Sequence, residues 1–236
     1  TQGYSSAASD VYKRQVLEGL AHSDFEHMTV YSEVLQNSMF DLIDAGKVDF
    51  ASGTSLTISA DRRDSFFRDF ERYRDKIILR PQEISNHPEI IRRLGVIAVN
   101  TVIEADLYGN TNSSYIDGSR LMNGVGGSGD YCQNAGLSIF ITKSTAKNGT
   151  LSCIVPHVSH VDHTIHEIHA LITEQGVADL RGLDTVDRAS CIIENCAHPK
   201  FRPALREYLK NATESCAHRG NPIDLRAALD FNKYLQ

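Results

Sequence analysis

The chain has 236 residues, 41% of them hydrophobic, with a formal net charge of −6 at pH 7 and a pI near 5.9. This composition supports a substantial globular core, and the acidic balance argues against nucleic-acid or anionic-membrane partners, because both require a concentrated positive field. The apolar runs, such as 96–99 and 139–141, are too short to span a bilayer, so we expect a soluble chain.

The N-terminal part of the chain changes character at Val16. Residues 1–15 (TQGYSSAASDVYKRQ) are rich in Ser, Ala and Gly without an apolar period, which predicts an unstructured leader or a non-native remnant. The stretch 27–32 (HMTVYS) predicts a strand, and apolar residues at helical spacing from Val34 predict a helix that ends at Gly46. Glu33 therefore lies at a strand-to-helix junction, where α/β proteins often present reactive side chains.

The remainder alternates between strand and helix patterns. A strand and a turn are expected over 48–57, strands over 76–81, 96–110, 137–144 and 151–158, and helices over 61–75, 87–95, 187–196 and 202–211. The run 96–110 is mostly apolar and β-branched, which is typical of a strand buried on both faces. This order predicts one α/β domain with an open, largely parallel sheet and flanking helices.

The five cysteines are odd in number and show no CxxC spacing, so neither a disulfide framework nor a zinc cage is indicated. We expect them to be small buried residues in a reducing compartment.

A glycine-rich segment, NGVGGSGD at 123–130, holds four glycines in eight residues. Missing side chains let backbone N–H groups approach a ligand closely, as an oxyanion hole or a phosphate nest requires. The segment matches neither GxGxxG nor GxxxxGK[ST], which disfavours nucleotide binding by those modes. Read alone, its glycines could equally serve the geometry of turns.

Histidines recur every third residue in HVSHVDHTIHEIH, at positions 157, 160, 163, 166 and 169. Imidazole is a common ligand of zinc, nickel and copper. A period of three drifts around a helix and alternates faces on a strand, so one element cannot direct all five at one ion. We therefore expect no metal site here, and a histidine-rich metal protein remains an alternative.

Other polar residues are ambiguous by themselves. Glu174 follows an apolar run and could be a solvated acid at the end of an element, whereas Asn86 could cap the helix that follows it. Glu104 and Asp106 interrupt an apolar strand, where a buried carboxylate needs hydrogen-bond partners.

Several long motifs, in unbroken order from about Val16 to Asn211, resemble the C-terminal part of acetyl-CoA hydrolases and succinyl-CoA:acetate CoA-transferases, which are class I CoA-transferases. These motifs are YSEVLQNSMFDLIDAGKVDFASGTS, ILRPQEISNHPEIIRRLGVIAVNT, EADLYGNTNSSYIDGSRLMNGVGGSGDY, IVPHVSHVDHT and TEQGVADLRGL. The resemblance implies a catalytic domain over 16–211, an uncertain tail over 212–236, and an absent N-terminal domain, since the chain is about half the family's usual length.

The resemblance also implies an activity and its residues. Glu33 takes the position of the family's nucleophilic glutamate, and Gly127 that of its oxyanion N–H donor. Asn86 and Glu174 match residues that contact acyl-CoA or the carboxylate substrate, and Gly124 and Gly126 lie in the same substrate-binding loop. Acyl-CoA and small carboxylates are then the substrates, with coenzyme A entering as a thioester and no cofactor permanently bound. The full-length enzyme would be a homodimer in the cytoplasm or in mitochondria.

Two alternatives to CoA transfer stay open at this point. Water rather than a carboxylate could resolve the covalent intermediate, which would make the protein an acetyl-CoA hydrolase. A half-length chain could also be an inactive fragment.

Overall fold

A computed structural model describes residues 19–216 and 220–231. The described chain divides into two compact units: an N-terminal unit of residues 19–96 with 134–136, and a C-terminal unit of 97–133, 137–216 and 220–231. The expected leader at 1–15 lies outside the described residues. No helix in the described ranges is both long and apolar enough to cross a membrane.

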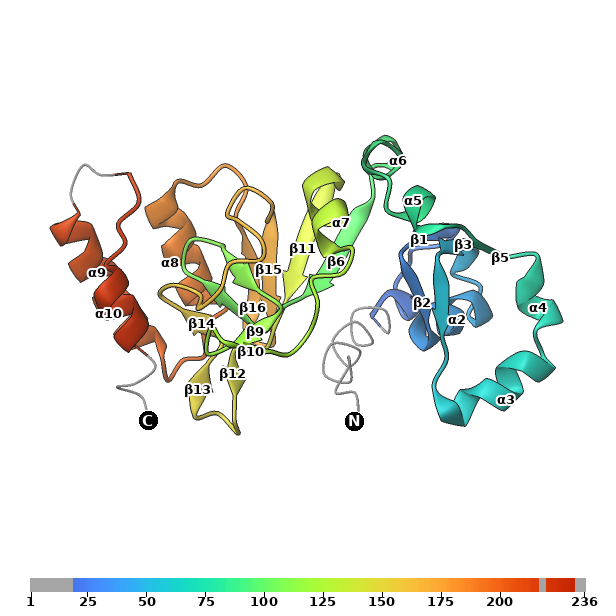
Figure 1. The fold of residues 1–236 in the computed structure, drawn as a ribbon, viewed down its shortest axis with the longest axis horizontal. Coiled ribbons are helices and arrows are strands. Elements are labelled where there is room, and N and C mark those ends of the chain that lie inside the picture. Colours follow the sequence, from blue (N-terminus) through green and yellow to red (C-terminus); the bar gives the residue numbers. More distant parts are fainter. Residues whose placement is uncertain (1–18, 217–219, 232–236) are drawn as a thin grey trace. The chain divides into compact units, whose positions relative to one another are not determined.

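The N-terminal unit is built around a parallel sheet of order β1-β3-β5, with α2 packed against β3 (Figure 1). A second parallel pair, β2 with β4, adjoins it. The elements are β1 (Met28–Tyr31), β2 (Val34–Gln36), α2 (Asn37–Asp44), β3 (Val48–Gly53), β4 (Ser55–Thr57), α3 (Ala60–Arg68), α4 (Glu71–Arg74), β5 (Ile77–Leu79), α5 (Gln82–Ser85) and α6 (Pro88–Leu94).

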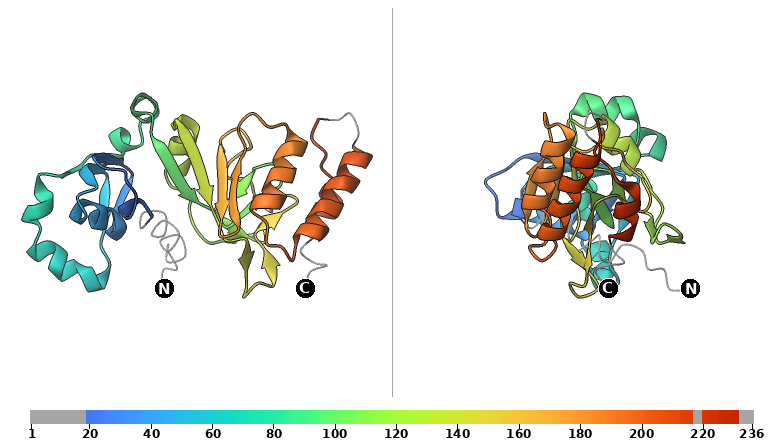
Figure 2. Two further views of the ribbon diagram at one scale, coloured as in Figure 1. Left: turned by 180° about the vertical axis from the view of Figure 1, so that it is seen from behind. Right: turned by 90° about the vertical axis from the view of Figure 1, so that its left-hand side faces the viewer.

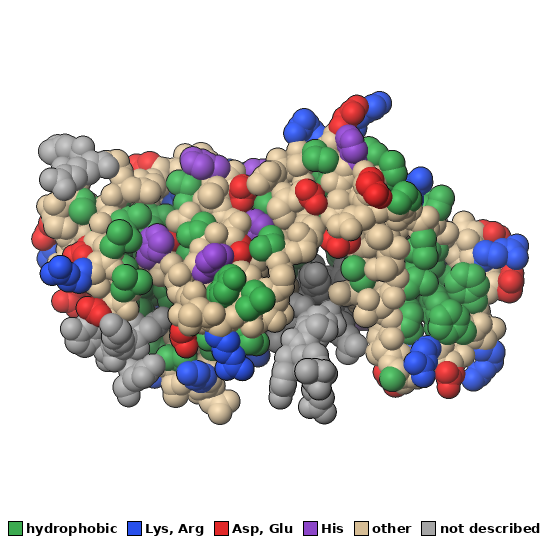
Figure 3. All heavy atoms as spheres, viewed as in Figure 1, with side chains coloured by type: hydrophobic (Ala, Val, Ile, Leu, Met, Phe, Trp, Pro, Cys, Tyr) green, Lys and Arg blue, Asp and Glu red, His purple; other side chains and the backbone are tan. Residues whose placement is uncertain are grey.

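An aromatic group forms part of the core of the N-terminal unit. Phe40 on α2 meets Phe66 and Tyr73 edge to face, at centroid distances of 4.7 and 5.5 Å. These rings pack with Leu35 of β2 and Val48 of β3, all of them buried. Through these contacts, α2, α3 and α4 pack against one another and against the strands. Hydrophobic side chains also gather on the surface of this unit (Figure 3), and its exposed large hydrophobics include Phe67, Ile78 and Leu79.

The C-terminal unit contains a four-stranded sheet of order β16-β15-β11-β6, in which only β16 runs antiparallel to its neighbour. Helix α8 packs against β16, and α9 packs against α8 (Figure 2). The main elements are β6 (Ile97–Thr101), α7 (Ser128–Asn134), β11 (Leu137–Ile141), β15 (Ala170–Thr173), β16 (Gly176–Asp179), α8 (Thr185–Asn195), α9 (Arg202–Ser215) and α10 (Leu225–Asp230).

Shorter strands complete the C-terminal unit. β7 pairs in parallel with β14 and antiparallel with β8, whereas β9 with β10 and β12 with β13 form antiparallel pairs. Their bounds are β7 (Glu104–Asp106), β8 (Thr111–Asn112), β9 (Tyr115–Ile116), β10 (Arg120–Leu121), β12 (Thr145–Ala146), β13 (Leu151–Ser152) and β14 (Ile154–Val155).

The predicted α/β class with mostly parallel open sheets is confirmed, but several local predictions were wrong. The strand expected over 151–158 divides into β13 and β14, which belong to different sheets. Residues 34–36 form β2 rather than the start of a helix, because Val34 and Leu35 pair in register with Ser55 and Leu56. The helix expected over 61–75 breaks into α3 and α4. The strand expected over 96–110 divides into β6 and β7, which belong to different sheets, so the parallel strands form several sheets instead of one.

Candidate active site

Glu33 lies just beyond the carboxyl end of β1 and is half buried. Its backbone is fixed by the neighbouring strand, because Ser32 N donates to Ser52 O at 2.9 Å. The carbonyl oxygen of Glu33 in turn accepts from Thr54 N and Ser55 N at 2.7 and 3.2 Å. Glu33 is therefore at the expected edge of a parallel sheet, but it stands between two strands and not directly before a helix.

Asn86 faces Glu33 within the same unit. It follows α5, is only 7% exposed, and its Nδ2 donates to Glu33 Oε2 at 3.4 Å. The Tyr31 hydroxyl donates to Ile84 O at 2.6 Å, which ties the end of β1 to α5. The alternative that Asn86 caps the next helix was wrong, because the N-cap residue of α6 is His87. The structure thus brings together two residues that the sequence had singled out 53 positions apart.

The glycine-rich segment forms the loop that leads into α7. Gly124 and Gly126 are exposed, whereas Gly127 is buried directly before the first residue of the helix. Gly126 has a φ of +60°, a conformation that favours glycine. Ser128 holds the loop, since its hydroxyl donates to Val125 O at 2.8 Å and lies 2.9 Å from His163 Nε2.

Glu174 occupies the turn between β15 and β16 in the C-terminal unit. Ser144 N donates to Glu174 Oε2 at 2.9 Å, the Ser144 hydroxyl donates to Oε1, and Gln175 Nε2 donates to Oε1 at 3.1 Å. Partial burial raises the pKa of Glu174, but these hydrogen bonds outweigh it and hold the pKa below its usual range. The side chain is therefore an oriented carboxylate at neutral pH.

Ser144 is a residue that the sequence analysis missed. It is buried and lies three positions beyond Ile141, the last residue of β11. Ile141 pairs with Ile172 in the parallel register of β11 and β15, so residues just past both strand ends must lie close together. A correct pairing of these two strands would have placed Ser144 beside Glu174.

The five regularly spaced histidines have separate surroundings. His160 packs against the ring of Tyr115, His169 Nδ1 accepts from Ser138 N at 3.1 Å, and His166 is exposed. Figure 3 shows histidine side chains at several separate places on the surface of the C-terminal unit. Only His163 is deeply buried, at 1% exposed.

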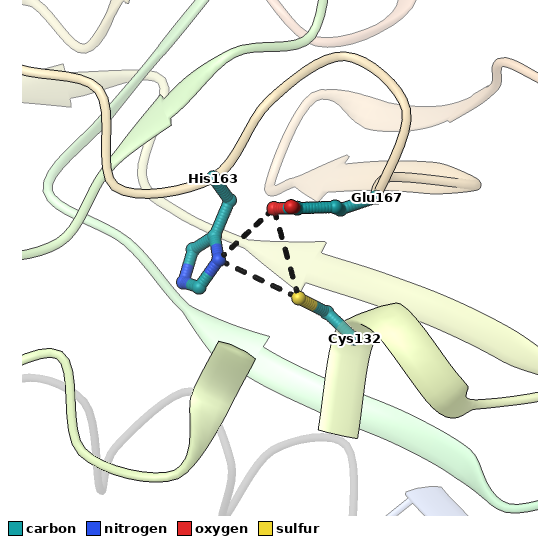
Figure 4. Close-up of side chains that lie close together, drawn as sticks. All are labelled: Cys132, His163 and Glu167. Carbon is teal, nitrogen blue, oxygen red and sulfur yellow. Dashed lines mark hydrogen bonds and ion pairs between the residues drawn. The ribbon is translucent and has the colours of Figure 1, made fainter. Parts of the chain in front are cut away.

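His163 lies beside Cys132 and Glu167 (Figure 4). Burial lowers the pKa of His163, against the opposing effect of the Glu167 and Asp162 carboxylates, so its imidazole is neutral at pH 7. Burial, reinforced by Glu167, raises the pKa of the Cys132 thiol to about 12. Cys153 and Cys196 are buried like Cys132, as expected, but the prediction was wrong for Cys191 and Cys216, which are partly exposed.

The two acids of β7, Asp106, which is buried, and Glu104, which is partly buried, both have hydrogen-bond partners. Asp106 Oδ1 accepts from the backbone N–H groups of Tyr108, Gly109 and Asn110, at 2.9 to 3.0 Å. Glu104 Oε1 accepts from Asn112 Nδ2 at 2.9 Å and from Ser159 N at 2.8 Å. These contacts give both acids a structural role within the C-terminal unit.

Residues 63–209 match the acetyl-CoA hydrolase/transferase C-terminal domain. The chain belongs to this family. A succinyl-CoA:acetate CoA-transferase of Clostridium kluyveri is 52% identical over 218 residues, which cover 92% of this chain and 40% of that protein. An acetyl-CoA hydrolase of Schizosaccharomyces pombe is 49% identical over 209 residues, covering 87% of this chain and 40% of that protein. This member of the acetyl-CoA hydrolase/transferase family therefore spans about 40% of the length of these curated relatives.

The structure of RipA from Yersinia pestis resembles that of this family member with a TM-score of 0.71 and 29% sequence identity. The match covers 84% of this chain and 47% of RipA. Within this chain, Glu33 and Asn86 belong to the N-terminal unit, and the C-terminal unit holds the other predicted site residues, Gly124, Gly126, Gly127 and Glu174.

Proposed function

We propose that this chain carries the catalytic glutamate of a CoA-transferase that moves coenzyme A between acetyl- or succinyl-CoA and acetate or succinate. The observation that carries the proposal is the position of Glu33, half exposed beyond the end of β1 with its carboxylate beside Asn86. A carboxylate at such a strand end can reach a substrate while its backbone stays fixed.

In the proposed reaction, a Glu33 carboxylate oxygen attacks the thioester carbonyl carbon of acyl-CoA. The carbon–sulfur bond breaks, which leaves an acyl-glutamyl anhydride and CoA thiolate. The thiolate then attacks the glutamyl carbonyl and releases the first carboxylate, so that Glu33 becomes a glutamyl-CoA thioester. A second carboxylate attacks this thioester and expels CoA thiolate, which leaves a new acyl-glutamyl anhydride. The thiolate then attacks the acyl carbonyl of that anhydride, which gives the new acyl-CoA and regenerates the Glu33 carboxylate. The energy of the thioester is retained because each step exchanges one acyl partner for another.

The remaining residues support this chemistry in distinct ways. Each tetrahedral intermediate develops an oxyanion, for which we assign the backbone N–H of Gly127 as donor, with Gly124 and Gly126 keeping the approach clear. Asn86 orients the Glu33 carboxylate, and Glu174, oriented by Ser144, contacts the acyl-CoA or carboxylate substrate. We propose a homodimer for the whole enzyme, with no permanently bound cofactor.

Acetyl-CoA hydrolysis is the second candidate, because relatives of similar identity include an acetyl-CoA hydrolase. The two reactions share the anhydride and glutamyl-CoA steps and differ in whether a carboxylate or water ends them. Release of CoA from acetyl-CoA should stay slow until succinate is added if the protein is a transferase. Fast release without succinate would instead support the hydrolase.

The covalent step can be tested by incubation with acetyl-CoA followed by borohydride, which reduces a glutamyl thioester to an alcohol. Peptide mass spectrometry should then find the loss of mass at Glu33. The peptide should remain unchanged in Glu33→Gln, whereas Glu83→Gln, which alters an exposed acid on α5, should react like the wild type.

Because the chain covers about 40% of its relatives, the same test is also made on a chimera that supplies the rest of the Clostridium kluyveri protein. If only the chimera reacts, Glu33 is the nucleophile and the added part is required for the reaction. An unmodified Glu33 in both proteins would contradict the proposal.

A further inference from the structure

The side chains of Cys132, His163 and Glu167 point toward one another, although they come from α7 and from the loop that precedes β15 (Figure 4). Cys132 Sγ lies 3.4 Å from His163 Nδ1, and Glu167 Oε2 lies 3.4 Å from the same nitrogen and 4.0 Å from the sulfur. One thiol, one imidazole and one carboxylate therefore share a single small space.

Nδ1 is the ring nitrogen of His163 that faces this space, and a hydrogen bond at Nε2 can leave its lone pair free for a cation. Ser128 has one hydroxyl hydrogen, and it donates that hydrogen to Val125 O at 2.8 Å. The Ser128 oxygen, 2.9 Å from His163 Nε2, can then accept a hydrogen from Nε2. In that tautomer Nδ1, which faces Cys132 and Glu167, carries no hydrogen and presents its lone pair to a cation.

The separations match those around a bound cation. A point equidistant from three atoms that are 3.4, 3.4 and 4.0 Å apart lies about 2.1 Å from each of them. Zinc takes sulfur at about 2.3 Å, imidazole nitrogen at about 2.0–2.1 Å and carboxylate oxygen at about 2.0–2.2 Å. Thus, only shifts of a few tenths of an ångström would bring all three ligands to bonding distance.

Groups around the three side chains already hold them in a ligating orientation. Ser128 fixes the imidazole of His163 through Nε2, as the partners of metal-bound histidines commonly do. The carboxylate of Glu167 accepts from Thr164 N at 3.0 Å and from Gln133 Nε2 at 2.9 Å. The side chain of Glu167 is 17% exposed, compared with 1% for His163, so an ion would enter from the Glu167 side.

We propose that Cys132, His163 and Glu167 form a binding site for one zinc-like divalent cation. Binding releases the thiol proton of Cys132 to solvent and forms bonds from the thiolate sulfur, from Nδ1 and from Oε2 to the metal. Thiolate and carboxylate together balance the charge of the cation, which makes its burial tolerable. The thiolate favours zinc over magnesium or calcium. The cation would fix α7 to the loop that contains His163.

The sequence could not indicate this site, because it uses only one of the five regularly spaced histidines. Its other ligands come from α7 and from the residue four positions after His163. A cage of five histidines would use His166 as a ligand, whereas this three-ligand site does not. The exposed His166 should be dispensable here.

The test begins with the chain stripped by a chelator and then dialysed against Zn²⁺ or Co²⁺. Elemental analysis should find one tightly held equivalent per chain, and Co²⁺ should show thiolate-to-metal charge-transfer absorption. Zn²⁺ should raise the melting temperature, since it binds the folded state. Failure of the wild-type chain to retain either metal would overturn the proposal.

Variants separate this site from incidental binding by the other histidines and cysteines. Cys132→Ala should lose the charge-transfer absorption, and both it and Glu167→Gln should lose the bound equivalent. Cys191→Ala and His166→Gln, which alter partly or fully exposed residues, should keep both. Circular dichroism checks that each variant is folded. If folded Cys132→Ala retains the equivalent with unchanged affinity, the site assigned here is wrong.

Discussion

Asn86 Nδ2 donates a hydrogen bond to Glu33 Oε2 at 3.4 Å, across 53 residues of sequence. The contact joins the end of β1 to the end of α5, and the Tyr31–Ile84 hydrogen bond fixes the same two segments. Asn86 thus gives the candidate nucleophile a buried, uncharged side-chain partner within its own unit.

Replacing Asn86 by Ala should lower kcat by about a hundredfold, because a misplaced reacting group costs about that factor. The rate of borohydride-trapped labelling at Glu33 should fall in parallel, while the melting temperature changes less. Gln82→Ala, at an exposed position of α5, is the matched control and should keep the wild-type rate. Equal rates in the two variants would remove the orienting role of Asn86.

Gly127→Val should reduce turnover by about 10²- to 10³-fold, the usual cost of losing an oxyanion donor, because the branched side chain blocks approach to its N–H. Gly129→Ala provides the comparison, since a Cβ there meets no atom within 4 Å and lies on α7. That control should retain activity and gain about 0.5–1 kcal/mol of stability. Steady-state kinetics and thermal melting measure both effects. Wild-type turnover in Gly127→Val would exclude the proposed oxyanion role.

Ser144→Ala should raise the pKa of Glu174, because it removes a hydrogen bond that stabilises the ionised carboxylate. If ionised Glu174 is needed for substrate binding, the acid limb of the kcat/KM profile should move to higher pH. Thr150→Ala, at an exposed position between β12 and β13, should leave the profile in place. An unchanged acid limb in Ser144→Ala would show that this carboxylate does not govern the profile.

Phe40→Ala should destabilise the N-terminal unit by about 3–5 kcal/mol, the range for truncating a buried aromatic side chain. Phe40 is 1% exposed and contacts both Phe66 and Tyr73, so its removal leaves a cavity among the rings. Leu94→Ala, at a position 58% exposed on α6, should change stability by no more than about 0.5 kcal/mol. Urea denaturation monitored by circular dichroism compares the two; equal losses would refute this account of the core.

The sequence by itself determined features that depend on neighbours along the chain. Strand β1 forms where β-forming residues gather in the sequence. Helix α6 begins at Pro88 and ends at Gly95, which has a φ of +61°. Gly46, with a φ of +72°, lies just after the C-cap residue of α2 and stops that helix, as expected. Family membership also rests on sequence, because long motifs in register need no coordinates.

Tertiary structure alone decided which distant segments pair and which polar groups meet. Val34 lies in a strand rather than a helix because β4 offers it a parallel partner, which no local preference reveals. The register of β11 and β15 brings Ser144 to Glu174, and α7 brings Cys132 to His163. Such contacts depend on strand register and helix placement, which are set by packing between residues far apart in sequence.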